Sequence, residues 1–237
     1  MEPFSPRSTM ITQNSPIPKV SQPTPYAPWR RFEPAVLKEL LDTVAAVNGQ
    51  LLGALVDSAR SDNLEFPLPE SLRGPVARLT VPERETIARC GVFLGDVNLW
   101  GVSHGRGIAD QSGMALSIEP ARPWLPAEQA LSLAHSMLLL SWYLIHTSPA
   151  VARVLLGMNA TGVAAYRALR VNDLAQIARA HPYRVRPRWP DQLDVWTHLV
   201  QGGGGAASPD PRSMTLRCLQ VSAGSSAGLS AHLGSSP

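Results

Sequence analysis

The sequence has little cysteine, few aromatic residues and few charges. Two cysteines, Cys90 and Cys218, are all that the 237 residues contain, and two thiols alone make neither a disulfide framework nor a metal site. Aromatic residues make up 6% and charged residues 16% of the chain, whereas aliphatic residues are plentiful. This composition is typical of small helical cores. We therefore expect a mostly α protein in a reducing compartment.

Long hydrophobic runs are also missing. The most apolar stretch, residues 131–145, is shorter than the roughly 20 residues that a membrane-spanning helix needs, and it includes His135. Residues 1–30 lack the apolar core of a secretory signal. We expect a core helix at 131–145, no membrane partner and a cytoplasmic location.

The motifs of catalysis are absent as well. The sequence contains no P-loop, no nucleophile elbow and no paired His or Cys motif for zinc. The stretch His104–Gly107 is similar to a Gly-rich loop, but no strand–turn–helix pattern surrounds it. We therefore predict that the protein is not an enzyme and that it needs no metal and no cofactor.

Proline and glycine divide the chain. The 22 prolines gather before residue 35 and at the junctions between helical segments. We predict a disordered Pro-rich arm at 1–32, a Gly/Pro linker at 101–127 and a Gly/Ser-rich flexible tail at 202–237, with a short helix near 214–221. Two helical modules, 33–100 and 128–201, remain between these segments.

In the first module, apolar residues recur at helical spacing from Val36 to Val56. Thr80 and Glu83 form a capping-box pattern with Pro82 in the first turn, which predicts a helix start. The predicted elements are a helix with Pro34 in its first turn that ends near Arg60, helices at 70–79 and 81–90, and then extended or irregular chain at 92–100.

In the second module, short breaks separate a series of helices. The breaks are Ser148-Pro149, Gly157 and a pair of asparagines, Asn159 and Asn172, which we interpret as helix caps rather than as base-reading residues. The predicted elements are helices at 131–146, 150–156, 161–169 and 172–180, followed by an extended segment at 183–189.

The chain also repeats itself. Residues 79–89 align without a gap on residues 169–179, and the two stretches share Leu, Val, an acidic residue and a final Ile-Ala-Arg in register. A long Leu-rich helix precedes each copy, and a segment that ends in Trp100 or Trp189 follows it. We interpret this as an internal duplication, with a degenerate first copy at 36–100.

The second module resembles the FlhD family, which provides one subunit of the bacterial flagellar master transcriptional regulator. The match is strongest over residues 131–189. It rests on the stretches Leu138–Ile145, Ala152–Asn159, Leu169 with Leu174–Ala178, and Arg184–Trp189. The tail piece Met214–Val221 is similar to a later helix of the family. Val185 stands where the family often has a cysteine, so no intersubunit disulfide is expected there.

The resemblance implies two small FlhD-like helical modules in tandem that bind promoter DNA together with an FlhC-like, zinc-containing partner protein. It also implies self-association through the long helix. The candidate interface residues are Leu138, Leu139, Trp142, Tyr143 and Ile145, of which Trp142 and Tyr143 serve equally well as core residues.

The charge distribution suggests where DNA would bind. Residues 33–99 hold ten acidic and six basic residues, whereas 147–201 hold seven arginines and three aspartates. In an extended segment, Arg184, Arg186 and Arg188 would share one face, and arginine forks suit phosphate groups. Pairing of these arginines with aspartates, or simple solvation, is the alternative. The candidate DNA-binding residues are Arg170, Arg179, Arg184, Arg186 and Arg188.

We therefore predict a transcription regulator, an activator of flagellum biogenesis genes. The alternative is a diverged helical adaptor that binds proteins and has lost the DNA role, which the acidic first module and the modest net charge of +3 favour.

Overall fold

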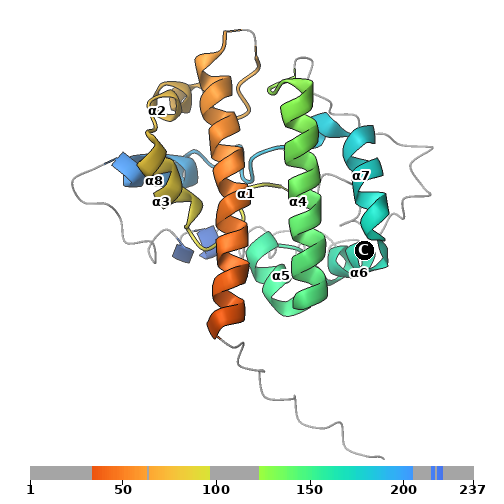
Figure 1. Cartoon of the computed structure of the whole chain (residues 1–237). Helices are drawn as coiled ribbons and strands as arrows, with labels where there is room; N and C mark the ends of the chain where they lie inside the picture. Colours follow the sequence, from red (N-terminus) through yellow and green to blue (C-terminus); the bar gives the residue numbers. More distant parts are fainter. Residues whose placement is uncertain (1–33, 63, 97–122, 205–214, 217, 221–237) are drawn as a thin grey trace, which may run out of the picture. The chain divides into compact units, whose positions relative to one another are not determined.

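Two long helices, α1 (Pro34–Arg60) and α4 (Ala127–Thr147), pack against each other at the centre of the fold, and the shorter helices pack around them. The structure, a computed structural model, describes residues 34–62, 64–96, 123–204, 215–216 and 218–220. Figure 1 shows α1 and α4 running in opposite directions. Three predicted segments lie wholly or mostly outside the described residues: the disordered arm at 1–32, the linker at 101–127 and the tail at 202–237.

The first long helix confirms the sequence prediction. Its apolar positions recur every three or four residues and lie in the core because they form one face of the helix. The buried members of this face are Leu40, Val44, Val47, Leu51, Leu52, Leu55 and Val56. Burial of one such side chain contributes about 1.5–3 kcal/mol relative to exposure.

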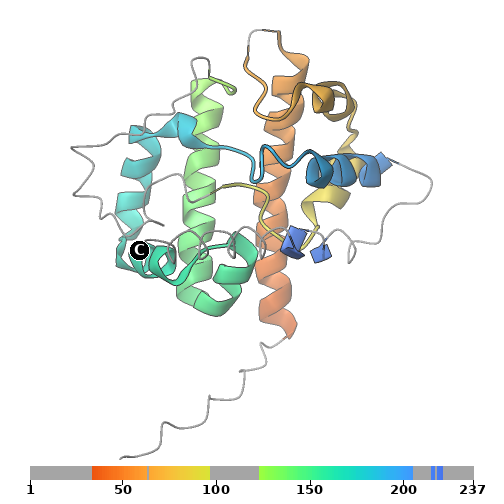
Figure 2. The ribbon, with the colours of Figure 1, turned by 180° about the vertical axis from the view of Figure 1, so that it is seen from behind.

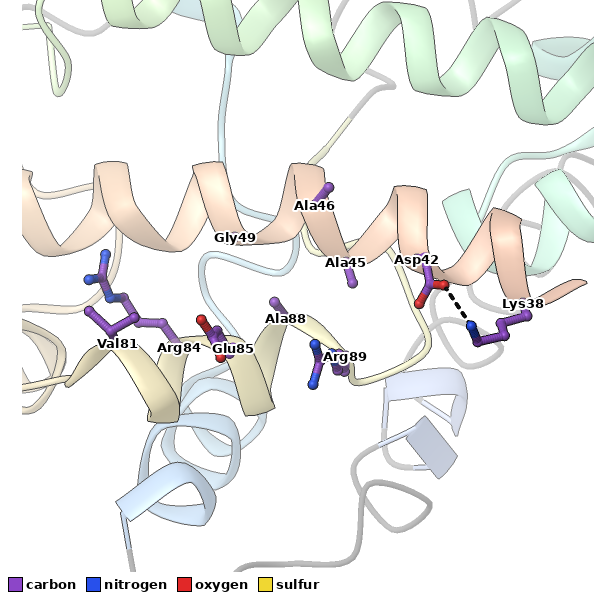
Figure 3. Close-up of a pocket in the computed structure, with 10 residues that line it drawn as sticks. All are labelled: Lys38, Asp42, Ala45, Ala46, Gly49, Val81, Arg84, Glu85, Ala88 and Arg89. Carbon is purple, nitrogen blue, oxygen red and sulfur yellow. Dashed lines mark ion pairs between the residues drawn. The ribbon is translucent and has the colours of Figure 1, made fainter.

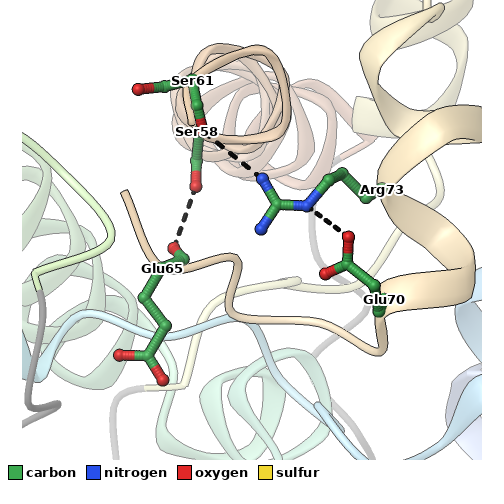
Figure 4. Close-up of polar contacts among 5 residues, drawn as sticks. All are labelled: Ser58, Ser61, Glu65, Glu70 and Arg73. Atoms are coloured by element: carbon green, nitrogen blue, oxygen red, sulfur yellow. Dashed lines mark hydrogen bonds and ion pairs between the residues drawn. The ribbon is translucent and has the colours of Figure 1, made fainter. Parts of the chain in front are cut away.

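A short turn and two short helices follow α1, close to where the sequence placed them: η1 (Glu70–Leu72), α2 (Arg73–Ala77) and α3 (Val81–Ala88). The loop before η1 is tied to the end of α1 (Figure 4). Ser58 Oγ donates to the carbonyl of Glu65 at 3.1 Å, and Arg73 donates to the carbonyl of Ser61 at 3.4 Å. Arg73 also pairs with Glu70 at 2.7 Å. These contacts fix α2 against the end of α1.

The capping box at α3 is formed as predicted. The backbone N–H of Thr80 donates to Glu83 Oε2 at 2.7 Å, and the Thr80 hydroxyl donates to the same oxygen at 2.8 Å. These hydrogen bonds hold the pKa of the Glu83 carboxyl below its usual range. The charged form of Glu83 therefore stabilises the start of α3.

The second half continues from α4 through α5 (Pro149–Leu156), α6 (Ala160–Ala168), α7 (Val171–Ala180) and η5 (Pro182–Arg184). Ser148 caps α5, and Gly157 ends it with φ 64°. Asn159 caps α6, as predicted, by accepting from the backbone N–H of Gly162 at 2.7 Å. Ser148, Gly157 and Asn159 thus have their expected local roles.

One cap was predicted wrongly. Asn172 lies inside the first turn of α7, and Arg170 is the residue at the cap position. The side chain that stabilises this helix start is Asp173, whose carboxylate accepts from the backbone N–H of Arg170 at 2.8 Å. An acid at the third helical position replaces an asparagine cap because it reaches back to the free backbone amide.

The aligned stretches of the sequence adopt matching local structure. α3 begins at Val81 and α7 begins at Val171, which are aligned positions. In each helix an acid at the third position accepts from the backbone N–H of the residue just before the helix. Each helix also packs against the long helix that precedes it in the chain. The duplication itself stays a prediction.

The segment after η5 crosses from the α7 side of the fold to the α1 side, as Figure 2 shows. It ends at α8 (Leu193–Gly204), which packs against α2 and α3 rather than against the helices of its own predicted module. The second predicted module therefore contributes α8 to the first, and the described residues from Pro34 onward cluster as one unit.

Candidate functional site

The predicted row of three arginines does not form. Residues 182–184 are a 3-10 turn, and only a single antiparallel bridge, between Gly95 and Pro187, follows it. Arg188 is 7% exposed, so its guanidinium cannot reach a phosphate at the surface. The prediction of an alternating extended face was wrong for Arg188 because residues 182–184 form a 3-10 turn and the tertiary fold buries residues 187–189 together.

Arg188 joins three segments of the chain. Its Nη1 donates to the carbonyl of Leu155 at 3.2 Å and to that of Phe93 at 3.4 Å, and its guanidinium stacks over the ring of Trp189 at 4.4 Å. A cation at the carbonyl end of α5 also interacts favourably with the helix dipole. Burial lowers the pKa of Arg188 to about 10, and the nearby charge of Asp96 opposes that shift. Arg188 is a structural residue.

The backbone around Arg188 also forms hydrogen bonds with distant segments of the chain. Its N–H donates to the carbonyl of Leu94 at 2.7 Å, and the N–H of Asp96 donates to the carbonyl of Arg186 at 2.9 Å. Two buried indoles also donate to the segment: Trp124 to the carbonyl of Val185 at 2.6 Å and Trp196 to that of Arg188 at 2.9 Å. Residues 185–188 are thereby fixed between the two halves.

The remaining arginines form a basic region on the second half. Residues 149–189 contain six arginines besides the buried Arg188, and a single acid, Asp173; with Arg188 included, the formal net charge of the stretch is +6. Among the described residues no ion pair joins the exposed arginines of this region to an acidic side chain. These four are Arg153, Arg167, Arg170 and Arg179. Arg184 and Arg186 are half-buried and have further contacts.

The predicted interface residues of α4 divide into two groups. Leu138 and Ile145 are fully buried in the chain's own core, so they cannot face a second copy, and the interface prediction was wrong for both. Leu139 is 42% exposed. Trp142 and Tyr143 are half-buried, and the indole of Trp142 donates to the carbonyl of Leu169 at 2.9 Å. Helical periodicity decides this split, because α4 packs on α1, α5, α6 and α7 and leaves only one face outside.

A groove lies between α1 and α3 (Figure 3). It has a volume of about 830 Å³ and is lined by Lys38, Asp42, Ala45, Ala46, Gly49, Val81, Arg84, Glu85, Ala88 and Arg89. Lys38 pairs with Asp42 at 3.7 Å, and the buried Nε of Arg84 has no hydrogen-bond partner among the described residues. Small-molecule sites are mostly apolar and enclosed, whereas this groove is charged and lies at the surface. It suits a protein segment better than a cofactor.

Sequence reasoning missed a buried polar centre in the first half. Asn48 is completely buried; its amide donates to the carbonyls of Ala88 at 3.0 Å and Val92 at 2.8 Å, and its Oδ1 accepts from the N–H of Leu94 at 2.9 Å. The sequence signal for this burial is the position of Asn48 in the apolar stripe of α1, next to Val47 and one turn before Leu51. Asn48 fixes the segment that follows α3.

The part of the chain that the structure describes contains no group of three or more His, Cys, Asp or Glu side chains placed to hold a metal ion. Within the same residues, no helix is long and apolar enough to cross a membrane. No known protein family, curated protein or solved structure matches the chain.

Proposed function

We propose that the protein is a DNA-associated transcription regulator whose second half contacts the phosphate backbone through the arginines of α5 to η5. The observation that carries the proposal is the excess of arginine at residues 149–189, where six arginines besides the buried Arg188 stand against one acid and four of the six are exposed without an ion pair among the described residues. Arg170, Arg179, Arg184 and Arg186 remain as candidates, and Arg153 and Arg167 join them.

The chemistry of these side chains favours a polyanion. Guanidinium groups make two directed hydrogen bonds to a phosphate, and such contacts position a protein on DNA without reading its sequence. The single acid of the region, Asp173, accepts from the backbone N–H of Arg170, so it is already engaged at the start of α7. The region is thus suited to hold a phosphate backbone.

The resemblance to the FlhD family supplies the finer part of the proposal. It suggests that an FlhC-type partner completes the DNA-binding unit, that promoters of flagellar and motility genes are the targets, and that the regulator acts in the cytoplasm. Arginines that supply affinity without base contacts agree with a division of labour in which another subunit reads the bases.

The test is a DNA-binding titration at two salt concentrations, with and without a co-expressed FlhC-type partner. Removing one arginine–phosphate contact reduces the steepness of log K against log salt by about 0.9. We expect Arg170→Gln/Arg179→Gln to weaken binding and to reduce this slope by about 1.8. Arg89→Gln is the matched control, because Arg89 is exposed and aligns with Arg179 in the first repeat. A slope that Arg89→Gln reduces as much as Arg170→Gln/Arg179→Gln does would contradict the assignment.

A second function, that of a protein-binding adaptor, is favoured by the groove between α1 and α3. This half carries nine acidic and six basic residues between 34 and 96, and so it suits nucleic acid poorly. An absence of DNA binding in every mixture, together with co-purification of a partner that Glu85→Lys disrupts, would replace the regulator with the adaptor.

A further inference from the structure

The two cysteines, far apart in the sequence, meet in the structure. Cys90 follows α3, and Cys218 lies in the short helical piece 218–220 near the end of the chain. Their side chains are 0% and 1% exposed, and the two thiols are hydrogen-bonded to each other. Both cysteines are in the thiol form.

The contact between the thiols lies beside a second, closely packed contact, between Thr215 and residues 90–91, which we call the seam. The Thr215 hydroxyl donates to the carbonyl of Cys90 at 2.6 Å. Gly91 adopts φ 75°, and a Cβ placed on it would lie 3.0 Å from Thr215 Oγ1. A glycine is required here for both its backbone conformation and the close approach of Thr215. The C-terminal piece is therefore positioned on residues 90–91 independently of the thiols.

The surroundings distinguish the two thiols. The hydrogen bond from Cys90 lowers the pKa of Cys218, and the guanidinium of Arg188 lowers it further, against the effect of burial. The same hydrogen bond and burial raise the pKa of Cys90. Cys218 is thus the thiol that ionises first, and the thiolate is the nucleophile in disulfide exchange.

We propose that Cys90 and Cys218 form a redox site in which a reversible disulfide fastens the C-terminal helical piece to the end of α3. The oxidant is a low-molecular-weight disulfide, RSSR. The Cys218 thiolate attacks one of its sulfur atoms and releases RS⁻, which leaves a mixed disulfide on Cys218. Cys90, once deprotonated, then attacks the Cys218 sulfur and releases the second RS⁻. Two protein thiols are oxidised and one RSSR is reduced to two RSH.

Burial makes the reaction depend on local opening. A disulfide reagent reaches Cys218 only when the helical piece 218–220 moves away from Cys90, so the rate reports on the population of that open state. The bridge, once formed, holds the C-terminal piece against the segment that follows α3, where Asn48 and Arg188 bind the residues 92–94. The redox state would therefore control the attachment of the chain's C-terminal part to the joint between the two halves.

The experiment uses the full-length, reduced protein and glutathione disulfide, followed by peptide mapping under non-reducing conditions. We expect loss of both thiols, an intrachain Cys90–Cys218 bridge, and a mass lowered by two hydrogen atoms. Because the chain has only two cysteines, no other intrachain bridge exists to confuse the result. Survival of both thiols, a bridge between two chains, or a glutathione adduct that persists without a bridge would each overturn the proposal.

Two kinds of variant separate the steps. Cys90→Ser should stop the reaction at a glutathione adduct on Cys218, and Cys218→Ser should react more slowly than Cys90→Ser. Thr215→Val keeps both thiols and the core but removes the hydrogen bond to Cys90. A neutral hydrogen bond contributes about 1 kcal/mol, so the rate of the first step should rise about fivefold. An unchanged rate would show that the seam does not control access to the thiols.

Discussion

Gly157 leaves the space that the guanidinium of Arg188 occupies. A Cβ on Gly157 would overlap the end of the Arg188 side chain, and Gly157 itself has φ 64°, in the left-handed region. The glycine that ends α5 and the arginine that binds the carbonyl end of α5 are therefore required together. This pair anchors the segment 185–189 to the second half, from which the chain crosses to α8.

Gly157→Ala should destabilise the protein. The substitution places a side chain at a positive φ, which costs about 1–2 kcal/mol, and it also displaces Arg188 from its carbonyl partners. We expect a loss of at least about 2 kcal/mol in the free energy of unfolding, measured by chemical denaturation. Gly49→Ala is the matched control, because its Cβ meets nothing within 4 Å inside α1. It should be neutral or stabilise by up to about 1 kcal/mol. A Gly157→Ala variant as stable as Gly49→Ala would contradict the close packing.

Arg188 and Arg179 should show opposite phenotypes. Arg188→Ala removes a buried side chain and leaves the carbonyls of Phe93 and Leu155 with fewer donors, so we expect a loss of about 2–4 kcal/mol. Arg179→Ala, at an exposed position, should change stability by no more than about 0.5 kcal/mol. Denaturation and DNA titration on both variants test this. If Arg188→Ala kept its stability and lost DNA binding, the structural role given to Arg188 would be wrong.

The capping box of α3 should make stability depend on pH. Hydrogen bonds from Thr80 lower the pKa of Glu83 in the folded state, so its contribution is present above the unfolded pKa and is lost as pH falls through the folded pKa. An unfolded glutamate titrates near pH ~4.3. The stability advantage of the wild type over Glu83→Gln should therefore shrink as the pH falls below about 4.3. Glu85→Gln is the control, because it removes a carboxylate from the same helix at a position outside the capping box.

The neighbours Leu138 and Leu139 should separate folding from association. Leu138 is fully buried, so Leu138→Ala should cost about 2–5 kcal/mol. Leu139 is exposed, so Leu139→Ala should leave the free energy of unfolding of a monomer nearly unchanged. A shift in oligomeric state in Leu139→Ala, measured by sedimentation or light scattering, would support self-association through the outer face of α4. No shift in either stability or assembly would leave that face without the predicted role.

The sequence by itself determined most of the helices and the breaks between them, but it predicted neither α8 nor the residue that caps α7. Amphipathic spacing placed α1 and α4, the Thr80 and Glu83 pair started α3, and Ser148, Gly157 and Asn159 separated the short helices. These signals are local, because a cap or a left-handed glycine acts on backbone groups within four residues of itself. The unequal charge of the two halves was also readable from residue types alone.

Only the tertiary structure decided what the candidate site contains. Arg188 looked like its neighbours Arg184 and Arg186 in the sequence, yet its partners are the carbonyls of Phe93 and Leu155, contributed by distant segments. The meeting of Cys90 with Cys218 and the passage of α8 to the first half likewise depend on long-range packing. Burial of a residue depends on the whole fold. A hydrophobic pattern with a period of two or 3.6 residues carries no information about which distant segment will cover that residue.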